Sequence, residues 1–197
     1  MNAQRRLLTH HFVAAAALLA LGACGKQEAA APAAAPAAAK PGADEAYTLA
    51  AGANGFTVGA MMAANTVYVF FDTTCPHCAE LWKSSQPLLT RLKLVWIPIG
   101  LLRPQSGPQG ATILAAPDPA AAMAENEAKV ADRSGGITAS GSIPAEVTAK
   151  VQANTELFRK LGADSVPLIV FKNAKTGAAG QHAGALDTQG LATLVGL

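Results

Sequence analysis

The amino-acid sequence predicts an α/β domain in which helices cover a mixed β-sheet. Short apolar runs rich in β-branched and aromatic residues, typical of buried strands, stand on both sides of a long block, 104–162, whose pattern is helical. A turn-forming segment separates the last two strand-like runs, as in an antiparallel hairpin. This order of strand, helix, strand, helical block, hairpin and helix is typical of a mixed sheet covered by helices.

The earliest expected elements lie around the first buried strand. Tyr47–Ala51 and Phe56–Val58 flank the glycine-containing segment 52–55, so we expect either a hairpin or a single edge strand with a turn. Thr66–Phe71 is a continuous apolar run, and it indicates a buried central strand.

A helix is expected directly after this strand, from about Pro76 to Leu92. Pro76 lies near its first turn, where a missing N–H group costs little. Pro87 lies inside the helical pattern and must kink the helix or end its first segment. Leu94–Ile99 then indicates a second buried strand.

The helical block contains three expected helices and the glycine-rich segment 135–141. The helices span about Pro108–Ala116, Pro119–Ser134 and Pro144–Leu161. The chain then returns to strand and ends in a helix that Asp187 caps. These last elements are a strand at Val166–Lys172, a turn at Asn173–Gly177, a weaker strand at Ala178–Ala183 and a helix to about Val195.

Residues 1–23 are expected to be a secretion signal. Arg5 and Arg6 precede the uncharged apolar run Phe12–Leu21, which is too short to span a bilayer. The run Leu21-Gly22-Ala23-Cys24 resembles the lipobox of bacterial lipoproteins, which implies that Cys24 becomes a lipidated N-terminus after cleavage. An ordinary signal peptide with an incidental cysteine is the alternative.

The lipobox implies a periplasmic protein that is anchored to a membrane by its N-terminal lipid. Gly25, which follows the cysteine in place of an aspartate, implies the outer membrane rather than the inner one. Residues 24–45 are rich in alanine and proline and cannot bury a core, so they predict an extended, disordered tether. Residues 46–197 are then expected to form one catalytic domain.

The charge balance argues against one class of partner. The chain has 15 basic and 13 acidic residues, and the signal contains two arginines and no acidic residue, so its removal leaves 13 of each. A net charge of zero argues against nucleic acid or an anionic surface as the main partner. We therefore expect no nucleic-acid binding.

The most informative motif is Cys75-Pro76-His77-Cys78, which follows the central strand and opens the next helix. Cysteines at this spacing can close a small ring, and the helix dipole and its unpaired N–H groups favour thiolate. Cys75 is the expected nucleophile, and Cys78, one turn further in, the expected buried resolving thiol. His77 is expected either to lower the pKa of the Cys75 thiol further or to be an exposed side chain without redox effect. Pro76 is expected to stiffen the loop.

The cysteine count supports a catalytic pair. Cys24 belongs to the lipobox, so the two cysteines of the motif stand alone in the domain, where a bridge over so few residues would constrain the unfolded chain little. Zinc would need further ligands, but His77 and His182 are the histidines left after signal removal. Haem attachment would need histidine after the second cysteine, where Ala79 stands. We therefore expect no metal and no cofactor.

Four further segments, together with the motif, carry a family resemblance. They are Tyr68–Asp72, Leu101–Pro104, Ala111–Pro119, and Leu161-Gly162-Ala163 shortly before Val166-Pro167. From about Thr66 onward the chain resembles the catalytic domain of periplasmic thiol:disulfide interchange proteins of the DsbG and DsbC type. The resemblance implies a thioredoxin-like fold, whose mixed sheet is flanked by helices and carries a helical insertion at about 104–162.

The resemblance also implies an activity and its partners. The dithiol would exchange disulfides with client proteins that carry thiols or disulfides, and a membrane redox partner would restore its redox state. In the thioredoxin fold a cis-proline loop lies beside the dithiol, and the residue before that proline pairs with the client backbone. Val166 and Pro167 are therefore expected to be joined by a cis bond and to bind substrate. The oxidase direction and the isomerase or reductase direction both stay open.

Two features differ from the DsbG and DsbC type. That type carries a substantial dimerisation domain, whereas only residues 46–65 separate the tether from the central strand here, so we expect a monomer. The motif letters and Val166 before Pro167 are more similar to the strongly oxidising DsbA proteins. A thioredoxin-fold lipoprotein acting as a non-redox chaperone or binding module is the alternative function, because a fold alone does not define an activity.

Other polar residues near the motif permit more than one interpretation. Asp72 either moves protons for Cys78 or caps the turn at the end of its strand. Glu80 permits the same two interpretations. Trp82 and Lys83 are expected to be a packing residue and a surface residue.

Overall fold

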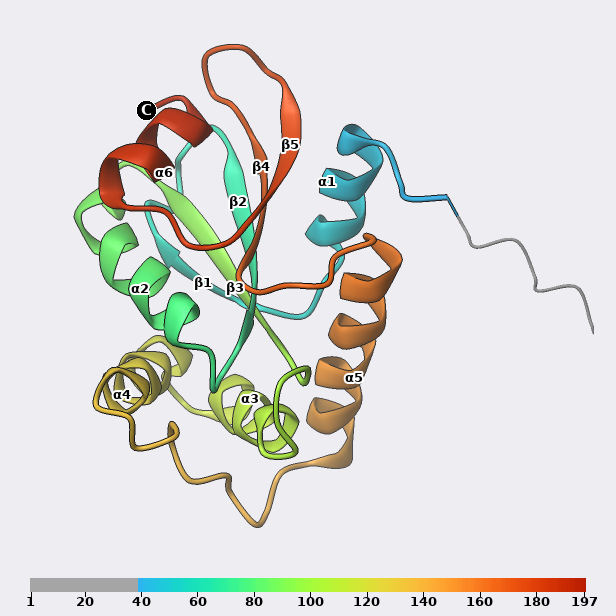
Figure 1. Cartoon of the computed structure of the whole chain (residues 1–197), viewed down its shortest axis with the longest axis vertical. Helices are drawn as coiled ribbons and strands as arrows, with labels where there is room; N and C mark the ends of the chain where they lie inside the picture. Colours follow the sequence, from blue (N-terminus) through green and yellow to red (C-terminus); the bar gives the residue numbers. More distant parts are fainter. Residues whose placement is uncertain (1–38) are drawn as a thin grey trace, which may run out of the picture. The chain divides into compact units, whose positions relative to one another are not determined.

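Five strands form one sheet in the part of the chain that the structure, a computed structural model, describes, which is residues 39–197. Their order is β1-β3-β2-β4-β5 (Figure 1). β2 and β3 run parallel, and the other neighbouring strands are antiparallel, so the predicted mixed sheet is confirmed. The strands are β1 Phe56–Gly59, β2 Thr66–Asp72, β3 Lys93–Ile99, β4 Leu168–Lys172 and β5 Ala179–Ala183.

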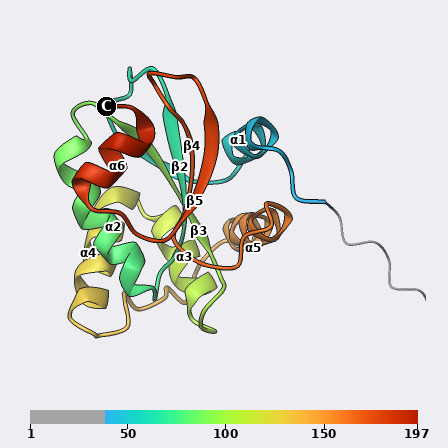
Figure 2. The ribbon, with the colours of Figure 1, turned by 45° about the horizontal axis from the view of Figure 1, so that its top comes forward.

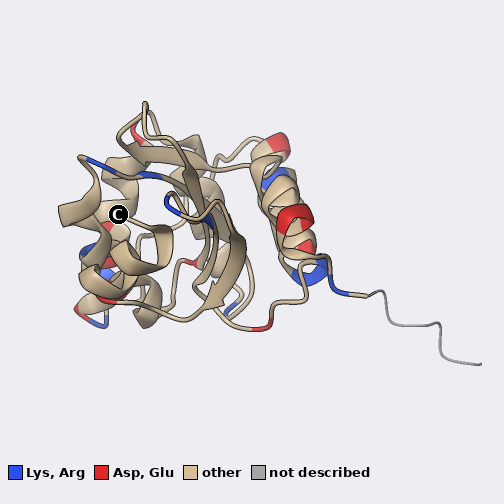
Figure 3. Cartoon of the chain, turned by 90° about the horizontal axis from the view of Figure 1, so that it is seen from above, with Lys and Arg blue, Asp and Glu red and all other residues tan. Residues whose placement is uncertain are grey.

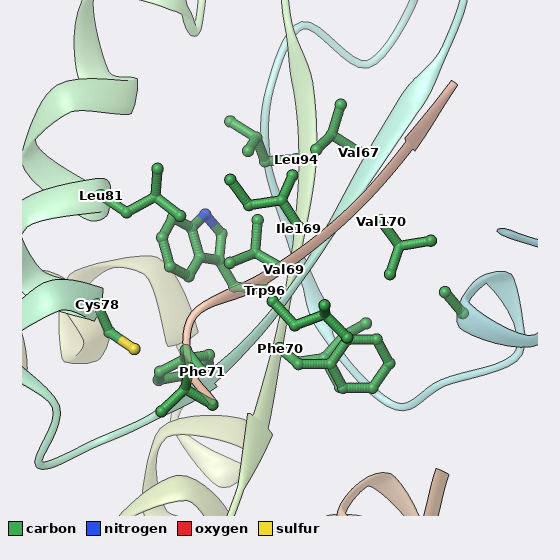
Figure 4. Close-up of a cluster of buried hydrophobic side chains, with 14 of the residues drawn as sticks. Val67, Val69, Phe70, Phe71, Cys78, Leu81, Leu94, Trp96, Ile169 and Val170 are labelled. Carbon is green, nitrogen blue, oxygen red and sulfur yellow. The ribbon is translucent and has the colours of Figure 1, made fainter. Parts of the chain in front are cut away.

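Strand β2 lies at the centre of the sheet, as predicted. Val69 and Phe70 point to opposite faces because side chains alternate along a strand, yet both are fully buried. Figure 4 shows them packed among side chains of the neighbouring strands, including Trp96 and Ile169. A strand covered on both faces has no need of polar alternation, which explains the continuous apolar run in its sequence.

Different helices cover the two faces of the sheet. α1 and α5 lie together on one side, whereas α2, α4 and α6 lie on the other (Figure 1 and Figure 2). Charged residues lie mainly on the helices and loops, and α5 carries both signs (Figure 3). The helices are α1 Ala43–Ala51, α2 Pro76–Ser85, α3 Ser106–Ala115, α4 Pro119–Ala131, α5 Ala145–Lys160 and α6 Thr188–Val195.

The first helix corrects the expected hairpin. Tyr47–Ala51 is the second half of α1 and not a strand, while Phe56–Gly59 is the expected single edge strand. Ala46 and Ala50, one turn apart, are buried on α1, which packs against β4 and β5. The helical period begins before Tyr47, among alanines of high helix propensity, so a pattern read from Tyr47 onward misses it.

The other elements are confirmed with shifted ends. Pro87 lies in the short 3₁₀ turn Gln86–Leu88 directly after α2, so the helix ends its first segment there, as predicted. The Asp187 carboxylate accepts a hydrogen bond from Gly190 N at 2.7 Å and caps α6, also as predicted. β4 begins at Leu168, after a proline that has no N–H group to donate.

Some expectations concern residues that lie outside the described range of 39–197. They are the signal peptide at 1–23, the lipidated Cys24 and most of the tether at 24–45. The last residues of the expected tether, 43–45, are instead the first residues of α1, so the folded domain begins before residue 46, where the sequence analysis placed its start. Within residues 39–197, every helix is too short or too polar to cross a membrane.

Candidate active site

The two cysteines of the motif lie where β2 leads into α2. Cys75 is the N-cap of α2, with an extended backbone (φ −88°, ψ 116°), and Pro76 lies in the first turn. Cys75 is 4% exposed, whereas Cys78 is fully buried, and Figure 4 shows the Cys78 sulfur directed toward Phe71. Both thiols are free. In residues 39–197, no group of three or more His, Cys, Asp or Glu side chains is placed to hold a metal ion.

The surroundings shift the pKa values of the two thiols in opposite directions. The pKa of Cys75 is lowered to about 7, chiefly because the Cys78 thiol donates a hydrogen bond to it, and also by backbone N–H groups of Cys78 and His77, while burial opposes this shift. Burial raises the pKa of Cys78 well above its ordinary value, and its bond to Cys75 raises that pKa further. The site therefore holds one sulfur with thiolate character and one that stays protonated.

His77 is paired with Glu80 at the surface of α2. Its Nδ1 lies 2.9 Å from Glu80 Oε2, and this hydrogen bond and the carboxylate charge raise the pKa of His77. The two side chains are 68% and 64% exposed, so the pair adds little to stability. Its effect is to favour a positive charge near Cys75. Glu80 thus contacts His77, whereas the sequence had left its role open.

The loop before β4 places a backbone carbonyl against the nucleophile. The bond between Val166 and Pro167 is cis, as the resemblance predicts. The Cys75 thiol donates a hydrogen bond to Val166 O at 3.6 Å, across 91 residues of sequence. Pro167 O accepts from Gly184 N at 2.8 Å, which ties the loop to the end of β5. The structure therefore brings Val166 and Pro167 together with the motif.

The buried carboxylate of Asp72 accepts five hydrogen bonds. Its Oδ1 accepts from Thr74 N at 2.9 Å, from Thr74 Oγ1 at 2.8 Å and from Ser106 Oγ at 2.7 Å. Its Oδ2 accepts from the N–H groups of Leu101 and Leu102, each at 2.9 Å. Of the two interpretations of this residue, a capping role at the strand end agrees with so complete a set of donors.

The helical block contributes polar residues that the sequence analysis missed. Asn126 Nδ2 donates to Thr73 O, and Thr73 Oγ1 donates to Gln109 Oε1, each at 2.9 Å. Gln109 Nε2 donates to Ile137 O at 2.7 Å, and Ile137 N donates to Asn126 Oδ1 at 3.0 Å. Gly136 has φ +87°, and a Cβ there would lie 2.6 Å from Asn126 Oδ1. In the sequence these amides look like ordinary polar helix positions, and only packing shows that they support the loop before Cys75.

Glu127, beside Asn126, is a further residue that the sequence analysis missed. Its side chain is buried, and Oε1 accepts from Asn126 Nδ2 at 3.1 Å. Burial raises the pKa of Glu127 to about 8, and the negative charges of Cys75 and Asp72 add to this shift, which the Asn126 hydrogen bond opposes. A buried carboxyl group whose charge interacts with the dithiol belongs to the site.

A comparison with protein families assigns this fold to a known class. Residues 52–183 match the family model described as Thioredoxin. The chain therefore belongs to the thioredoxin family, and the predicted thioredoxin-like fold is confirmed.

Two curated relatives confirm the resemblance to the DsbG type. The thiol:disulfide interchange protein DsbG of Pseudomonas aeruginosa is 32% identical over 136 residues, which are 68% of this chain and 52% of the relative. DsbG of Escherichia coli is 30% identical over 135 residues, which are 66% of this chain and 52% of that protein. The chain thus spans about half the length of these relatives.

Solved structures agree on the fold. The catalytic domain of Proteus mirabilis ScsC has a TM-score of 0.60 at 21% identity, over 78% of this chain and 93% of that chain. A disulfide interchange protein from Neisseria gonorrhoeae has a TM-score of 0.54 at 18% identity, over 72% of this chain and 93% of its own. At these identities the likeness shows the fold.

Replacing Cys78 with alanine should raise the pKa of Cys75 above about 7, because it removes the hydrogen bond that lowers this pKa most. The ultraviolet absorbance of the thiolate, followed against pH, measures the change. Lys83→Gln, on the exposed side of the same helix, should leave the pKa where it is in the wild-type protein. A Cys78→Ala variant that titrates like the wild type would contradict the hydrogen bond.

Proposed function

We propose that this protein is an extracytoplasmic thiol:disulfide oxidoreductase that exchanges disulfides with client proteins through Cys75 and Cys78. The observation that carries the proposal is the placement of the two thiols, with Cys75 as the N-cap of α2 beside the Val166 carbonyl and Cys78 fully buried one turn further along. The pKa of Cys75 is accordingly lowered to about 7, and that of Cys78 is raised. Such a pair supplies a nucleophilic thiolate and a resolving thiol that stays protonated until the mixed disulfide has formed. Membership of the thioredoxin family and the similarity to DsbG proteins support it.

The reaction begins when the Cys75 thiolate attacks a client disulfide. A bond forms between Cys75 Sγ and one client sulfur, and the other client sulfur leaves as a thiolate. Cys78 then attacks Cys75 Sγ, so that the Cys75–Cys78 disulfide forms and the client leaves reduced. The reverse sequence oxidises a client dithiol and leaves this protein reduced.

Val166 and Pro167 are the proposed client-binding residues. Val166 O lies 3.6 Å from Cys75 Sγ, so a client that reaches the nucleophile also reaches this stretch of backbone. An extended client segment would pair with the backbone of Val166, as peptides add to exposed backbone edges elsewhere. Pro76, in the first turn of α2 directly after Cys75, would stiffen the backbone of the motif.

We infer that the dithiol is a strong oxidant. His77 of the motif and Val166 before Pro167 support this inference, because both are more similar to the strongly oxidising DsbA proteins. A positive charge on His77 would stabilise the thiolate of the reduced form, and stabilising the reduced form makes the disulfide form more oxidising. A protein of this kind takes electrons from its clients and passes them to a membrane redox partner.

The place of action follows from the N-terminal residues. We propose that Cys24 is lipidated, that the residues between Cys24 and α1 tether the catalytic domain, and that the monomeric protein faces the periplasm from the outer membrane. The lipobox-like run before Cys24 supports the anchor, and Gly25 after it supports the outer membrane.

Cys75→Ser should lower insulin reduction, client thiol oxidation and repair of scrambled disulfides to the rates measured without protein, because serine cannot form a mixed disulfide. Cys78→Ser, as the matched variant, should still attack clients and accumulate mixed disulfides that non-reducing gels display. If all three activities survived in Cys75→Ser, the enzymatic function would be wrong and a non-redox binding module would be favoured.

The reduction potential of the dithiol should lie nearer to about −120 mV than to the about −270 mV of thioredoxin. Equilibration with glutathione buffers measures it. His77→Ser should make the potential more negative, since it removes a positive charge that stabilises the thiolate. A wild-type potential below about −200 mV would contradict the oxidising assignment.

Mass spectrometry of the N-terminal peptide, from protein made in a host that processes lipoproteins, should show a lipidated Cys24 as the first residue. Cys24→Ser should abolish the lipid and release the protein from membranes. An unmodified cysteine in the mature wild-type protein would remove the anchor from the proposal.

A further inference from the structure

A pocket of about 400 Å³ adjoins the nucleophile, and two arginines line it. Thr74 and Pro76, the chain neighbours of Cys75, form part of its lining. Arg103, from the loop after β3, and Arg133, from the loop after α4, form another part. The other lining residues are Gln105, Val130 and Gly135, so this pocket has two basic side chains and no acidic one among residues 39–197.

No carboxylate in the described part of the chain neutralises these two arginines. Both side chains are exposed, and the ion pairs of residues 39–197 are formed by other side chains. Asp72 is occupied by five hydrogen bonds from other donors. Asp132, beside Arg133 in the chain, is exposed and does not line the pocket. The two guanidinium groups can therefore bind an anion that enters the pocket.

The backbone of Arg103 is fixed by the network that surrounds the dithiol. Arg103 N donates to Ser106 Oγ at 3.2 Å, and Ser106 Oγ donates to Asp72 Oδ1 at 2.7 Å. Asp72 also accepts from Thr74 N, in the loop before Cys75. The segment that carries Arg103 is thus held in a defined position relative to the loop of the nucleophile.

The backbone of Arg133 has a conformation that favours glycine. Arg133 N donates to Val130 O at 2.9 Å and Ser134 N donates to Lys129 O at 2.7 Å, which is the hydrogen-bond pattern of a Schellman motif at the end of α4. Arg133 has φ 61°, in the left-handed region, where a side chain costs free energy. Lys129 already supplies a basic side chain to the last turn of the helix. The helix end alone therefore does not account for an arginine at this position.

We propose that the pocket binds a carboxylate of the client, carried by an acidic residue beside the client cysteine, and this inference rests on the proposed function. Successive residues of an extended client lie about 3.3 Å apart, so the neighbours of a cysteine held at Cys75 reach the pocket beside Thr74 and Pro76. Guanidinium groups bind carboxylates through paired, charge-assisted hydrogen bonds. Arg103 and Arg133 thus select clients whose cysteine has acidic neighbours.

The exposure of the two arginines sets the size and the salt dependence of this selection. An exposed ion pair contributes little free energy, so two such pairs change a rate severalfold and not by orders of magnitude. Charges around a site also speed the encounter with a partner of opposite charge, and salt screens this effect. The selection should therefore be modest and should weaken as the ionic strength rises.

The test compares two activated peptides that differ only in charge. Each has one cysteine in a mixed disulfide with uncharged thiopyridine, and glutamate flanks this cysteine on both sides in one peptide, glutamine in the other. When Cys75 attacks the peptide sulfur, the bond to thiopyridine breaks, and the absorbance of the released thiopyridine gives the rate. Each rate is divided by the rate with mercaptoethanol, a neutral thiol, so that the intrinsic reactivity of the peptides cancels.

The reduced wild-type protein should prefer the glutamate peptide about fivefold at low ionic strength. The preference should disappear in about 0.5 M salt. Equal normalised rates for the two peptides at low ionic strength would overturn the proposal.

The double variant Arg103→Gln with Arg133→Gly should lose the preference. Glycine suits the left-handed backbone of residue 133, so Arg133→Gly alone should melt no lower than the wild type, and thermal unfolding separates loss of the preference from loss of the fold. A preference that stays unchanged in the double variant would overturn the proposal and assign the selection to the positive charge of His77.

Arg91→Gln is the matched control. It removes an exposed arginine just before β3, at the end of the sheet away from the dithiol, and should keep the wild-type preference. Loss of the preference in this variant would overturn the proposal, because net charge alone would then explain the selection. Failure of the reduced wild-type protein to release thiopyridine from either peptide would instead contradict the proposed function itself.

Discussion

The carboxylate of Asp72 holds together the three segments that surround the dithiol. It ends the central strand and accepts hydrogen bonds from the loop before Cys75, from the loop after β3 and from Ser106 at the start of α3. A buried carboxylate needs donors on both oxygens, and these donors come from segments up to 34 residues apart. Satisfying them defines how strand, loops and helix meet, and so positions the N-terminus of α2.

The chemistry of the dithiol follows from that position. Cys75 lies at the helix terminus, where the Cys78 thiol and unpaired backbone N–H groups stabilise negative charge on its sulfur. Cys78, one turn further along, faces the apolar core beside Phe71, where negative charge is unfavourable. The nucleophilic sulfur of Cys75 and the resolving sulfur of Cys78 thus lie one helical turn apart, and the Val166 carbonyl lies against the Cys75 sulfur.

The helical block does more than cover the sheet. Gln109 on α3 and Asn126 on α4 bond to Thr73, so both helices support the loop that leads to the nucleophile. The same packing buries Glu127 beside α2 and leaves one of its oxygens free. The block therefore supports the active site, and burial of Glu127 in it, with the negative charge of Cys75 as a smaller cause, raises the pKa of this carboxyl group to about 8.

The sequence by itself determined which segments along the chain form strands and most of the helices, and it located the dithiol. It could do so because hydrophobic period, turn residues and a Cys-x-x-Cys spacing are local properties. It left Asp72 with two interpretations and missed α1 and the roles of Asn126 and Glu127. Only the tertiary structure decided these points. Three of the donors to Asp72, the strands behind α1 and the helix that covers Glu127 come from segments distant in sequence, and no local pattern records which distant segments meet.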